Sequence, residues 1–442
     1  MERIGYVVLS AFAFVAVAVG ALTTALPLGE FLVTSAAETA SAFAGMVWIT
    51  WWALVVGFAI AGGVEAWVSS DAISQHLEGE GVRELALGTF FGFVSSSCSY
   101  SAIATAKNLF KKGASAPASL GAFMFASTNL VIEIGFVIWL LLGWQFVVAD
   151  FLGGLVLIAL LALAFRYLVP DEVVEQAREN VEDAGTATDP NCGMDVDVEE
   201  TDYTKEVDGT TYYFCSKSCM EGWSPEDANT TIREQVTTLS GWRALANKQW
   251  KEWDMLWDEI LIGFVFASIL TGFVPDSVWT SLFGEPVFGL PVYLVWTAIL
   301  GALVGILTFV CSVGNVPFGA LLFTEGLPFG GVLSYIYADL IIPPIMQAYR
   351  EYYGLHFAGI LSGLIFAAAV VTGILMHVVF AAAGLIPPVS QVHVAEFSIE
   401  LNYKAALNVF ATALFLVLYY LHKTDASDDD GGHGHDDHSH TA

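Results

Sequence analysis

The sequence predicts an all-α polytopic membrane protein with about ten transmembrane helices, arranged as two repeats with broken helices, and a small α+β insert between the repeats. Three observations support this prediction. The chain of 442 residues is 56% hydrophobic and only 14% charged, and its mean hydropathy is +0.64, values typical of a multi-span membrane protein. Two apolar stretches, one in each half of the chain, carry the same unusual polar motif. A polar segment with three of the five cysteines separates them.

The apolar stretches are long enough to cross a bilayer, because a helix rises about 1.5 Å per residue and the hydrocarbon core is about 30 Å thick. They cover residues 4–28, 43–67, 86–110, 118–142, 145–168, 258–275, 292–316, 325–346, 356–386 and 403–421. Four full crossings in each half would make the repeats parallel, whereas one re-entrant segment in each would make them inverted. The sequence leaves both arrangements open.

Most acidic residues lie outside these spans, with concentrations in residues 171–232 and 425–438, and the formal net charge is −29. An acidic surface repels nucleic acid, so nucleic acid is not an expected partner. Carboxylates also keep a surface hydrated at high salt, which indicates a halophilic source. Three lysines within residues 107–112 follow one span, and clustered lysines favour the cytoplasmic side. Residues 320–325, at the matching place in the second half, are not basic, so the charge rule does not decide the topology.

A polar motif recurs in the two halves. The stretch Ser95–Tyr100 lies in one apolar span, and Val310–Pro317 is its counterpart in another. Alignment on the cysteines matches Cys98 with Cys311, Ser99 with Ser312, Gly92 with Gly305, and Gly113 with Gly326. Thiols, hydroxyls and a proline are unfavourable in a lipid-facing helix, but they suit a broken helix that lines a polar cavity. The pair therefore predicts a transport site between the repeats. The alternative is that small residues here only allow close helix packing.

Further polar residues within the spans extend this candidate site. Asn129 and Glu133 are four residues apart on one helix face, so they line a pathway or form a hydrogen bond between helices. Asp339 precedes Pro343 and Pro344, which fits a bent helix beside a cavity. The expected transport site consists of Cys98, Ser99, Asn129, Glu133, Cys311, Ser312, Asn315 and Asp339. We expect the cysteines to hold a thiophilic ion, the asparagines to supply polar contacts, and Glu133 or Asp339 to take up a proton.

The soluble segments divide the chain into domains. The first membrane half covers residues 1–170, and the second covers 257–424. The remaining segments are an acidic linker at 171–188, a cysteine-containing domain at 189–224, an amphipathic linker at 225–256 and a disordered tail rich in Asp and His at 425–442.

The cysteine-containing domain has the features of a small metal site. Thr210–Phe214 are strong strand formers, and an Asp-Gly turn signal precedes them. Cys192 on a loop, with Cys215 and Cys219 at a strand-to-helix junction, would converge on one ion. Three thiolates suit Zn(II), Cu(I) or a trivalent metalloid such as As(III). Such a site would serve metal sensing or delivery, or it would hold a purely structural zinc.

This domain resembles the YHS domain, a small cysteine-containing module that recurs on metal-handling proteins. The resemblance rests on Asp189–Met194, Tyr212–Ser216 and Cys219. It implies that Cys192, Cys215 and Cys219 bind a metal ion, with Zn or Cu as candidates.

The membrane part is similar to the predicted permease family that includes the organoarsenical efflux permeases. The motifs that carry the resemblance are Cys98–Ser101, Leu109–Ala114, Phe125–Val131, Cys311–Pro317 and Ala338–Leu340. The resemblance implies transport across the cytoplasmic membrane, with efflux of trivalent methylated or aromatic arsenicals in the best-understood branch, whose members use membrane cysteines. The YHS-like insert adds metal ions to the candidate substrates.

Together these features predict a multi-pass permease of the cytoplasmic membrane that exports a thiophilic metalloid or heavy-metal species, with its insert in the cytoplasm. The sequence has no Walker motif and no P-type phosphorylation signature, so we do not expect direct use of ATP. A thiol oxidoreductase would be a further alternative, but the chain lacks a CxxC pair, and we expect a transporter rather than an enzyme. The alternatives are a membrane-anchored metal sensor or chaperone, and a permease for copper or another metal ion. The expected partners are the lipid bilayer and the substrate, and a homo-oligomer is left open. Only the YHS-like domain is expected to hold a cofactor.

Overall fold

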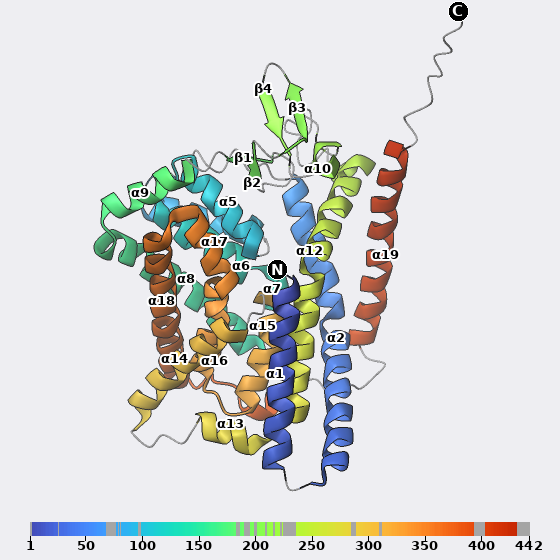
Figure 1. The fold of residues 1–442 in the computed structure, drawn as a ribbon, viewed down its shortest axis with the longest axis vertical. Coiled ribbons are helices and arrows are strands. Elements are labelled where there is room, and N and C mark those ends of the chain that lie inside the picture. The colour runs from blue at the N-terminus through green and yellow to red at the C-terminus, as the bar shows by residue number, and fades with distance from the viewer. Residues whose placement is uncertain are drawn as a thin grey trace, which may run out of the picture.

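The structure is a computed structural model that describes residues 2–24, 26–67, 77, 79, 81–95, 99–182, 186–189, 195–198, 201–207, 210–214, 217–221, 223, 236–283, 289–308, 312–392 and 403–430. Within these ranges the chain is a bundle of helices, and the strands lie in the insert at one end of the bundle (Figure 1). This arrangement confirms the all-α polytopic class.

The two halves contain the same order of elements from their first hairpin onward. The first half consists of α1 (Glu2–Thr23), α2 (Leu28–Trp67), α4 (Val82–Ser95), α5 (Ser99–Lys111), the π-helix η1 (Pro117–Phe123), α6 (Met124–Asn129), α7 (Ile132–Leu141) and α8 (Trp144–Leu168). The second half consists of α12 (Leu239–Phe273), α13 (Asp276–Phe283), α14 (Leu290–Thr308), α15 (Ser312–Thr324), α16 (Phe329–Ile336), the 3-10 helix η3 (Tyr337–Ile341), α17 (Pro343–Tyr353) and α18 (Leu355–Ala382). The short 3-10 helix η4 (Val389–Gln391) and α19 (Tyr403–Asp430) follow.

The described helices include five candidate membrane spans by length and apolar composition, or up to seven if each bent helix pair is one span. The sequence predicted about ten. The difference arises in part because the predicted spans 86–110 and 292–316 are not continuous helices. Each contains two shorter helices, separated by a short stretch that lies outside the described residues.

In the first half, α4 and α5 form a helical hairpin. A Cβ on Gly88 would lie 2.6 Å from the carbonyl oxygen of Ala118, and one on Gly92 would lie 2.5 Å from that of Phe123. These contacts show that α4 runs parallel to η1 and α6. By contrast, α5 runs in the opposite direction, because a tight turn at Gly113, with a φ of 101°, joins it to η1. The helices α4 and α5 are therefore antiparallel.

The second half repeats this hairpin with α14 and α15. A Cβ on Gly301 would clash with the carbonyl oxygen of Gly331, and one on Gly305 would lie 2.7 Å from that of Tyr335. The turn at Gly326, with a φ of 103°, then joins α15 to α16. Gly305 thus makes the same kind of contact as its sequence partner in α4, which explains why both positions are glycine.

The two hairpins enter the bundle from opposite ends. Phe110 near the end of α5 stacks on Phe357 at the start of α18, with ring centroids 6.5 Å apart. Phe323 near the end of α15 contacts Phe146 at the start of α8, at 5.1 Å. The helices α8 and α18 are antiparallel, since Phe165 near the end of α8 also stacks on Phe357, at 6.3 Å. The halves are therefore inverted repeats with one re-entrant hairpin each, which decides between the two arrangements that the sequence left open.

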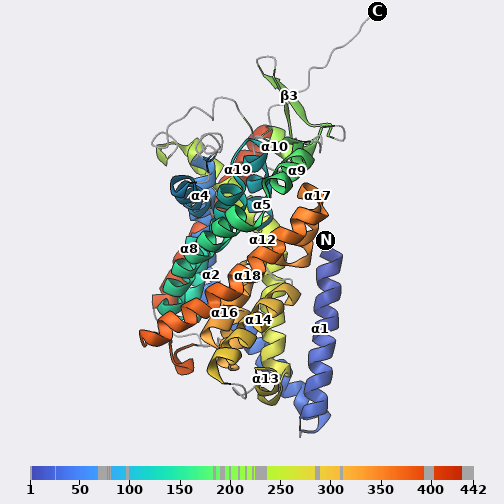
Figure 2. The same cartoon turned by 90° about the vertical axis from the view of Figure 1, so that its left-hand side faces the viewer.

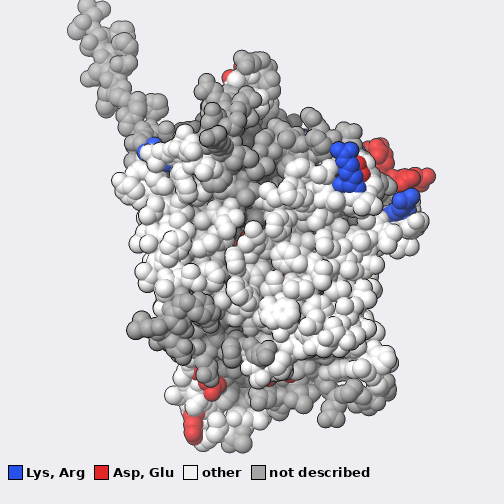
Figure 3. Space-filling view, turned by 180° about the vertical axis from the view of Figure 1, so that it is seen from behind, with Lys and Arg blue, Asp and Glu red and all other residues white. Residues whose placement is uncertain are grey.

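Charged side chains gather near the two ends of the molecule on the face shown in Figure 3. A broad uncharged band lies between them, and the long apolar helices cross this band (Figure 2). This distribution is expected for a protein whose middle is embedded in lipid.

The insert contains two small antiparallel sheets. Their strands are β1 (Thr186–Thr188) paired with β2 (Asp195–Asp197), and β3 (Thr204–Val207) paired with β4 (Thr210–Tyr213). The helix α10 (Lys217–Glu221) follows β4. Trp223 packs on Tyr212 and Phe214, with ring centroids 4.6 Å and 5.6 Å away. The predicted strand after the Asp-Gly signal is therefore confirmed, as is the helix that follows it.

The helix α9 (Asp171–Glu182), which precedes the insert, packs against the membrane part. The guanidinium of Arg178 donates to the carbonyl oxygens of Phe110 and Ala114, and it lies 4.1 Å from the centre of the Phe110 ring. Asn180 donates to the carbonyl oxygen of Tyr353 at 3.1 Å. The part of the chain predicted as an acidic linker therefore begins as a docked helix that touches the ends of α5 and α17.

Two segments are more helical than predicted. The amphipathic linker expected at 225–256 becomes part of the membrane half at Leu239, where α12 begins and continues without a break. This segment is helical because its tryptophans pack on α2 and α19. The tail expected to be disordered at 425–442 starts as helix, since α19 continues to Asp430. Residues 431–442 lie outside the described residues.

The close hairpin packing leads to a first prediction. We expect Gly305→Ala to lower the thermal unfolding midpoint of the purified protein, because the added Cβ meets backbone and overpacking costs about 1–3 kcal/mol. The matched control is Gly359→Ala in α18, where a Cβ meets nothing within 4 Å. The control is expected to keep or raise the midpoint, since alanine favours helix. Equal midpoints for the two variants, measured by tryptophan fluorescence, would contradict the packing.

Candidate functional site

The two hairpins meet at a pair of serines. Ser99 is the first residue of α5, and Ser312 is the first residue of α15. Their Oγ atoms are 3.3 Å apart, and both side chains are buried. Since α5 and α15 run from this contact toward opposite ends of the bundle, the contact lies near its middle. It joins the two halves at the motif that the sequence alignment paired.

Asp339 connects this contact to a third element. Its side chain is 1% exposed, and Ser312 donates a short hydrogen bond from Oγ to its Oδ2 atom. Asn129, at the end of α6, donates from Nδ2 to its Oδ1 atom at 3.2 Å. Ser99, Asn129, Ser312 and Asp339 thus form one buried network, which we call the Asp339 network. Two of its members come from each half of the chain.

The network lies where two helices are broken. The axis bends by 50° between η1–α6 and α7, and by 43° between α16–η3 and α17. In the first break, Leu130 and Val131 have non-helical backbone angles. In the second, Ile342 is extended and Pro343 lacks an N–H group. Broken helices expose backbone polar groups, and inside a membrane protein such backbone is tolerated where it lines a binding site or is buried in protein.

The electrostatics of the site favour a negative charge. The helices α5 and α15 both begin here, and a helix N-terminus carries a partial positive charge and unpaired N–H groups. Asp339 additionally receives the two side-chain hydrogen bonds described above. Hydrogen bonds to a carboxylate are stronger than those between neutral groups. The arrangement therefore compensates a buried carboxylate at the junction of the two halves.

Two amide groups keep unused hydrogen-bonding capacity. Asn315, one turn beyond Ser312, accepts a hydrogen bond on Oδ1 from the hydroxyl of Tyr335 at 2.7 Å. Its Nδ2 atom, like the Oδ1 atom of Asn129, is buried and has no partner among the described residues. Burying a polar atom without a partner is unfavourable. These atoms are therefore suited to bind a polar ligand or water.

The remaining residues of the predicted transport site fall into two groups. Glu133 lies in the first turn of α7, where its side chain packs against Gly57 of α2. The Cβ of Glu133 lies at the contact between α2 and α7, and the described hydrogen bonds to Asp339 come from Ser312 and Asn129. Cys98 and Cys311 lie outside the described residues, immediately before the two serines that meet.

The predicted metal site of the insert is described only in part. Cys219 lies in α10 and is partly buried, whereas Cys192 and Cys215 lie outside the described residues. In the part of the chain that the structure describes, no group of three His, Cys, Asp or Glu side chains is placed to hold a metal ion. The metal site therefore stays a prediction.

The sequence analysis missed Asp150, which lies in α8 and is fully buried. An ionisable residue within a long apolar span is a signal of function by itself, and this signal was present in the sequence. It also missed Tyr335 and Tyr337, whose hydroxyls bond within the same region. Aromatic residues are common in membrane spans, so the hydrogen bonds of these two hydroxyls could not be predicted from the sequence.

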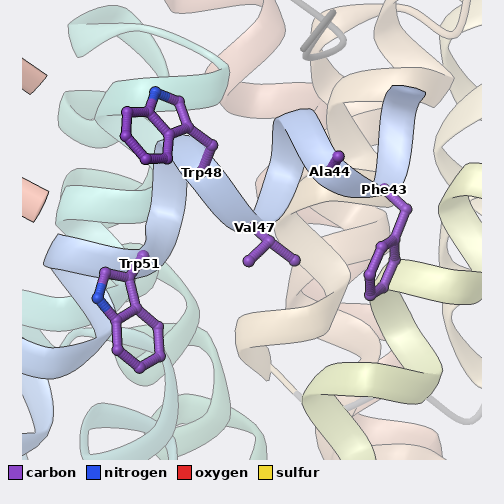
Figure 4. A pocket seen from close by; sticks show the side chains of 5 residues that line it. All are labelled: Phe43, Ala44, Val47, Trp48 and Trp51. Atoms are coloured by element: carbon purple, nitrogen blue, oxygen red, sulfur yellow. The ribbon is translucent and has the colours of Figure 1, made fainter. Parts of the chain in front are cut away.

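An apolar groove on α2 is distinct from the Asp339 network. It is lined by Phe43, Ala44, Val47, Trp48 and Trp51 (Figure 4). The indole N–H of Trp51 is already bonded to Thr412 at 3.0 Å. None of the predicted transport residues lines it, and its carbon-rich lining suits a lipid chain better than a polar substrate.

The serine contact leads to a second prediction. We expect Ser99→Cys with Ser312→Cys to form a disulfide in a chain whose native cysteines are replaced by serine, because the native oxygens are 3.3 Å apart. A protease site placed in the insert would then give two fragments that separate on a gel only after reduction. The control pair, Ser99→Cys with Ser362→Cys on α18, is expected to separate without reductant. Failure of the first pair to cross-link would contradict the meeting of the hairpins.

Comparison with known proteins identifies the family. A family model described as "Predicted permease" matches residues 35–378, a range that includes both hairpins and the Asp339 network. A protein of Mycobacterium tuberculosis (strain ATCC 25618 / H37Rv) named "Putative permease Rv2963" is 35% identical over 341 residues, which are 76% of this chain and 74% of that protein. No solved structure matches the chain at a significant level. The chain therefore belongs to the predicted permease family.

Proposed function

We propose that this permease exports a thiophilic species, either a trivalent organoarsenical-like metalloid or a heavy-metal ion, by alternating access at the Asp339 network. The observation that carries the proposal is the contact between the two inverted halves at Ser99 and Ser312, directly after the two membrane cysteines. In transporters built from inverted repeats, the substrate site lies at the repeat interface, among broken helices. A membrane anchor needs no such buried polar junction.

The mechanism follows from how the halves are joined. Each hairpin crosses only part of the bundle, so separation of the serines on one side would open the site toward that side. The thiolates of Cys98 and Cys311 would bind the soft ion, and soft metals and metalloids prefer such ligands. Asn129 and Asn315 would supply the polar contacts, since each has a buried amide atom without a partner among the described residues. Asp339 would carry the charge that changes during transport.

The insert would bind a metal ion through Cys192, Cys215 and Cys219, with Zn or Cu as candidates. The β3–β4 hairpin followed by α10 supports this proposal, because it places Cys219 on the helix that follows the strand. This YHS-like module would deliver or sense the ion beside the membrane part. A membrane-anchored sensor or chaperone without transport remains the competing function, and a flux measurement separates the two.

Because the repeats are inverted, the distribution of basic residues beside the spans indicates which end of the bundle faces the cytoplasm. Residues 107–112 and 320–325 end equivalent hairpins, so they lie at opposite ends of the bundle, and only the first range is basic. Further basic residues at the end that carries the insert are Arg166, Arg178, Lys248, Arg350 and Lys423. Basic residues beside spans favour the cytoplasmic side. We therefore propose that the insert lies in the cytoplasm.

This topology gives a third prediction, which is read out by cysteine labelling in intact cells. Glu175→Cys in α9, whose side chain is 69% exposed, is expected to react with a membrane-impermeant maleimide only after the cells are permeabilised. Glu30→Cys, exposed at the start of α2 at the other end of the bundle, is expected to react in intact cells. The background is a chain without its native cysteines. The reverse pattern of labelling would place the insert outside the cell.

The fourth prediction tests transport itself. Cells that express the chain are expected to survive As(III), methylated or aromatic arsenicals, Cu, Zn or Cd better than cells without it. Cys98→Ser with Cys311→Ser is expected to remove this protection, because the soft ligands are lost. Asp339→Asn is expected to do the same, because the network loses its charge.

The matched control is Cys219→Ser, which removes a thiol from the insert alone. In reconstituted vesicles supplied directly with the protective compound, this variant is expected to transport like the unmodified protein. Unchanged protection in the membrane double variant would contradict the proposed site. Protection without flux in any vesicle would favour the sensor.

A further inference from the structure

Asp150 is a buried acid that no step described so far uses. It lies in the second turn of α8, its side chain is 0% exposed, and neither carboxyl oxygen has a hydrogen-bond partner among the described residues. Burying an ionised carboxylate without donors costs several kcal/mol or more. A group in this position therefore needs a proton or a cation to accompany it.

The fold holds Asp150 next to the Asp339 network. The hydroxyl of Tyr337 donates to the backbone oxygens of Ala149 and Asp150, at 3.2 Å and 3.0 Å, and Tyr337 is two residues before Asp339 in η3. A Cβ on Gly153, one turn beyond Asp150, would clash with the same hydroxyl. Tyr337 therefore joins the part of α8 that carries Asp150 to the 3-10 helix that carries Asp339.

The other ionisable groups on the surrounding elements have their own contacts. His377 on α18 accepts a hydrogen bond on Nδ1 from the backbone of Gly330 at 3.3 Å, and Glu133 on α7 packs against Gly57. The hydroxyl of Tyr337 is bonded to the backbone at Asp150, and that of Tyr349 is bonded to the sulfur of Met124 at 3.4 Å. Within the described ranges, no Lys, Arg or His forms an ion pair with either acid.

We propose that Asp150 and Asp339 share one proton and that Asp150 is the proton-carrying group of the transport cycle, which deepens the proposed function and rests on it. The two acids have opposite surroundings. Asp339 has two donors and two helix N-termini, so it is the group suited to hold the negative charge. Asp150 has neither among the described residues, so the proton resides on it in this conformation.

The proton transfer balances without any further reactant. When the halves separate at the serines, Asp339 loses the hydrogen bond from Asn129 of the other half and becomes the better proton acceptor. The O–H bond on Asp150 then breaks as an O–H bond on Asp339 forms, and the negative charge moves from Asp339 to Asp150. Asp339 then releases its proton to water on the open side, and Asp150 takes up a proton from water on the other side when the site faces that side. Each cycle therefore moves one proton across and restores the resting pair.

The fifth prediction tests this pair without any substrate. Infrared spectra of the purified protein at neutral pH are expected to show the C=O stretch of a buried protonated carboxyl group, with a small shift in D2O. Asp150→Asn is expected to lose this band, and Asp150→Glu to retain it at a shifted position. Asp171→Asn, which removes an exposed acid from α9, is expected to leave it unchanged. If Asp150→Glu also lost the band, the band would depend on the geometry of the site and not on a carboxyl group at this position. That result would overturn the assignment.

Two further results would overturn the proposal. One is a band that survives in Asp150→Asn, or that is absent from the unmodified protein. The other is a band that appears only when Na⁺ is replaced by choline, because Asp150 would then be a cation site instead.

A vesicle experiment separates this proposal from the proposed function. Phenylarsine oxide is supplied as the probe, and the accumulation driven by a pH gradient is measured. Asp150→Asn is expected to lose this accumulation at least tenfold, and Asp171→Asn to retain it. If the unmodified protein does not move the probe, the arsenical assignment fails, and the infrared result still decides the role of Asp150. Full gradient-driven accumulation by Asp150→Asn would refute its role as the proton carrier.

Discussion

The hydrogen bonds to Asp339 are the constraint on which the rest of the structure depends. A carboxylate inside a membrane protein must be compensated, and its donors here come from Ser312 in the same half and Asn129 in the other half. Ser99 extends the network to the opposite hairpin. The network can form only if both hairpins end, and both bent helices break, at the same place. The charge therefore fixes the relative position of the two halves.

Close backbone approach makes this convergence geometrically feasible. Gly92 and Gly305 let each hairpin lie directly on the broken helix of its own half, where even a methyl group would meet a carbonyl oxygen. Gly113 and Gly326 adopt positive φ angles at the turns that reverse the chain. The glycines that align between the halves thus perform equivalent tasks. Polar residues supply the specificity of the junction, and glycines supply the space for it.

The sequence predicted which segments meet at the junction better than it predicted the arrangement of helices around it. The matched cysteine-serine pairs located both hairpin ends, and Asp339 before two prolines located the second break, because polar residues and proline are rare in apolar spans. From hydropathy alone, each hairpin was predicted as a single span, because a hydropathy profile does not distinguish two consecutive short apolar helices from one long helix. The Asn129–Glu133 spacing suggested a common face, but a break after Asn129 sends Glu133 to α2. Asp150 was overlooked because it stands outside any repeated motif.

The scaffold is symmetric, but its acids are not. Both α8 and α18 start after a glycine with positive φ, Gly143 and Gly354, and Leu361 occupies the position in α18 that Asp150 occupies in α8. Asp339 likewise belongs to one half only. Two inverted halves of equal chemistry would bind a proton equally well from either side. Because donors among the described residues reach only one of the two acids, the two open states of the proposed cycle would differ in proton affinity. The direction of coupled transport is still set by the gradients across the membrane, and the asymmetry affects how readily each open state takes up or releases the proton.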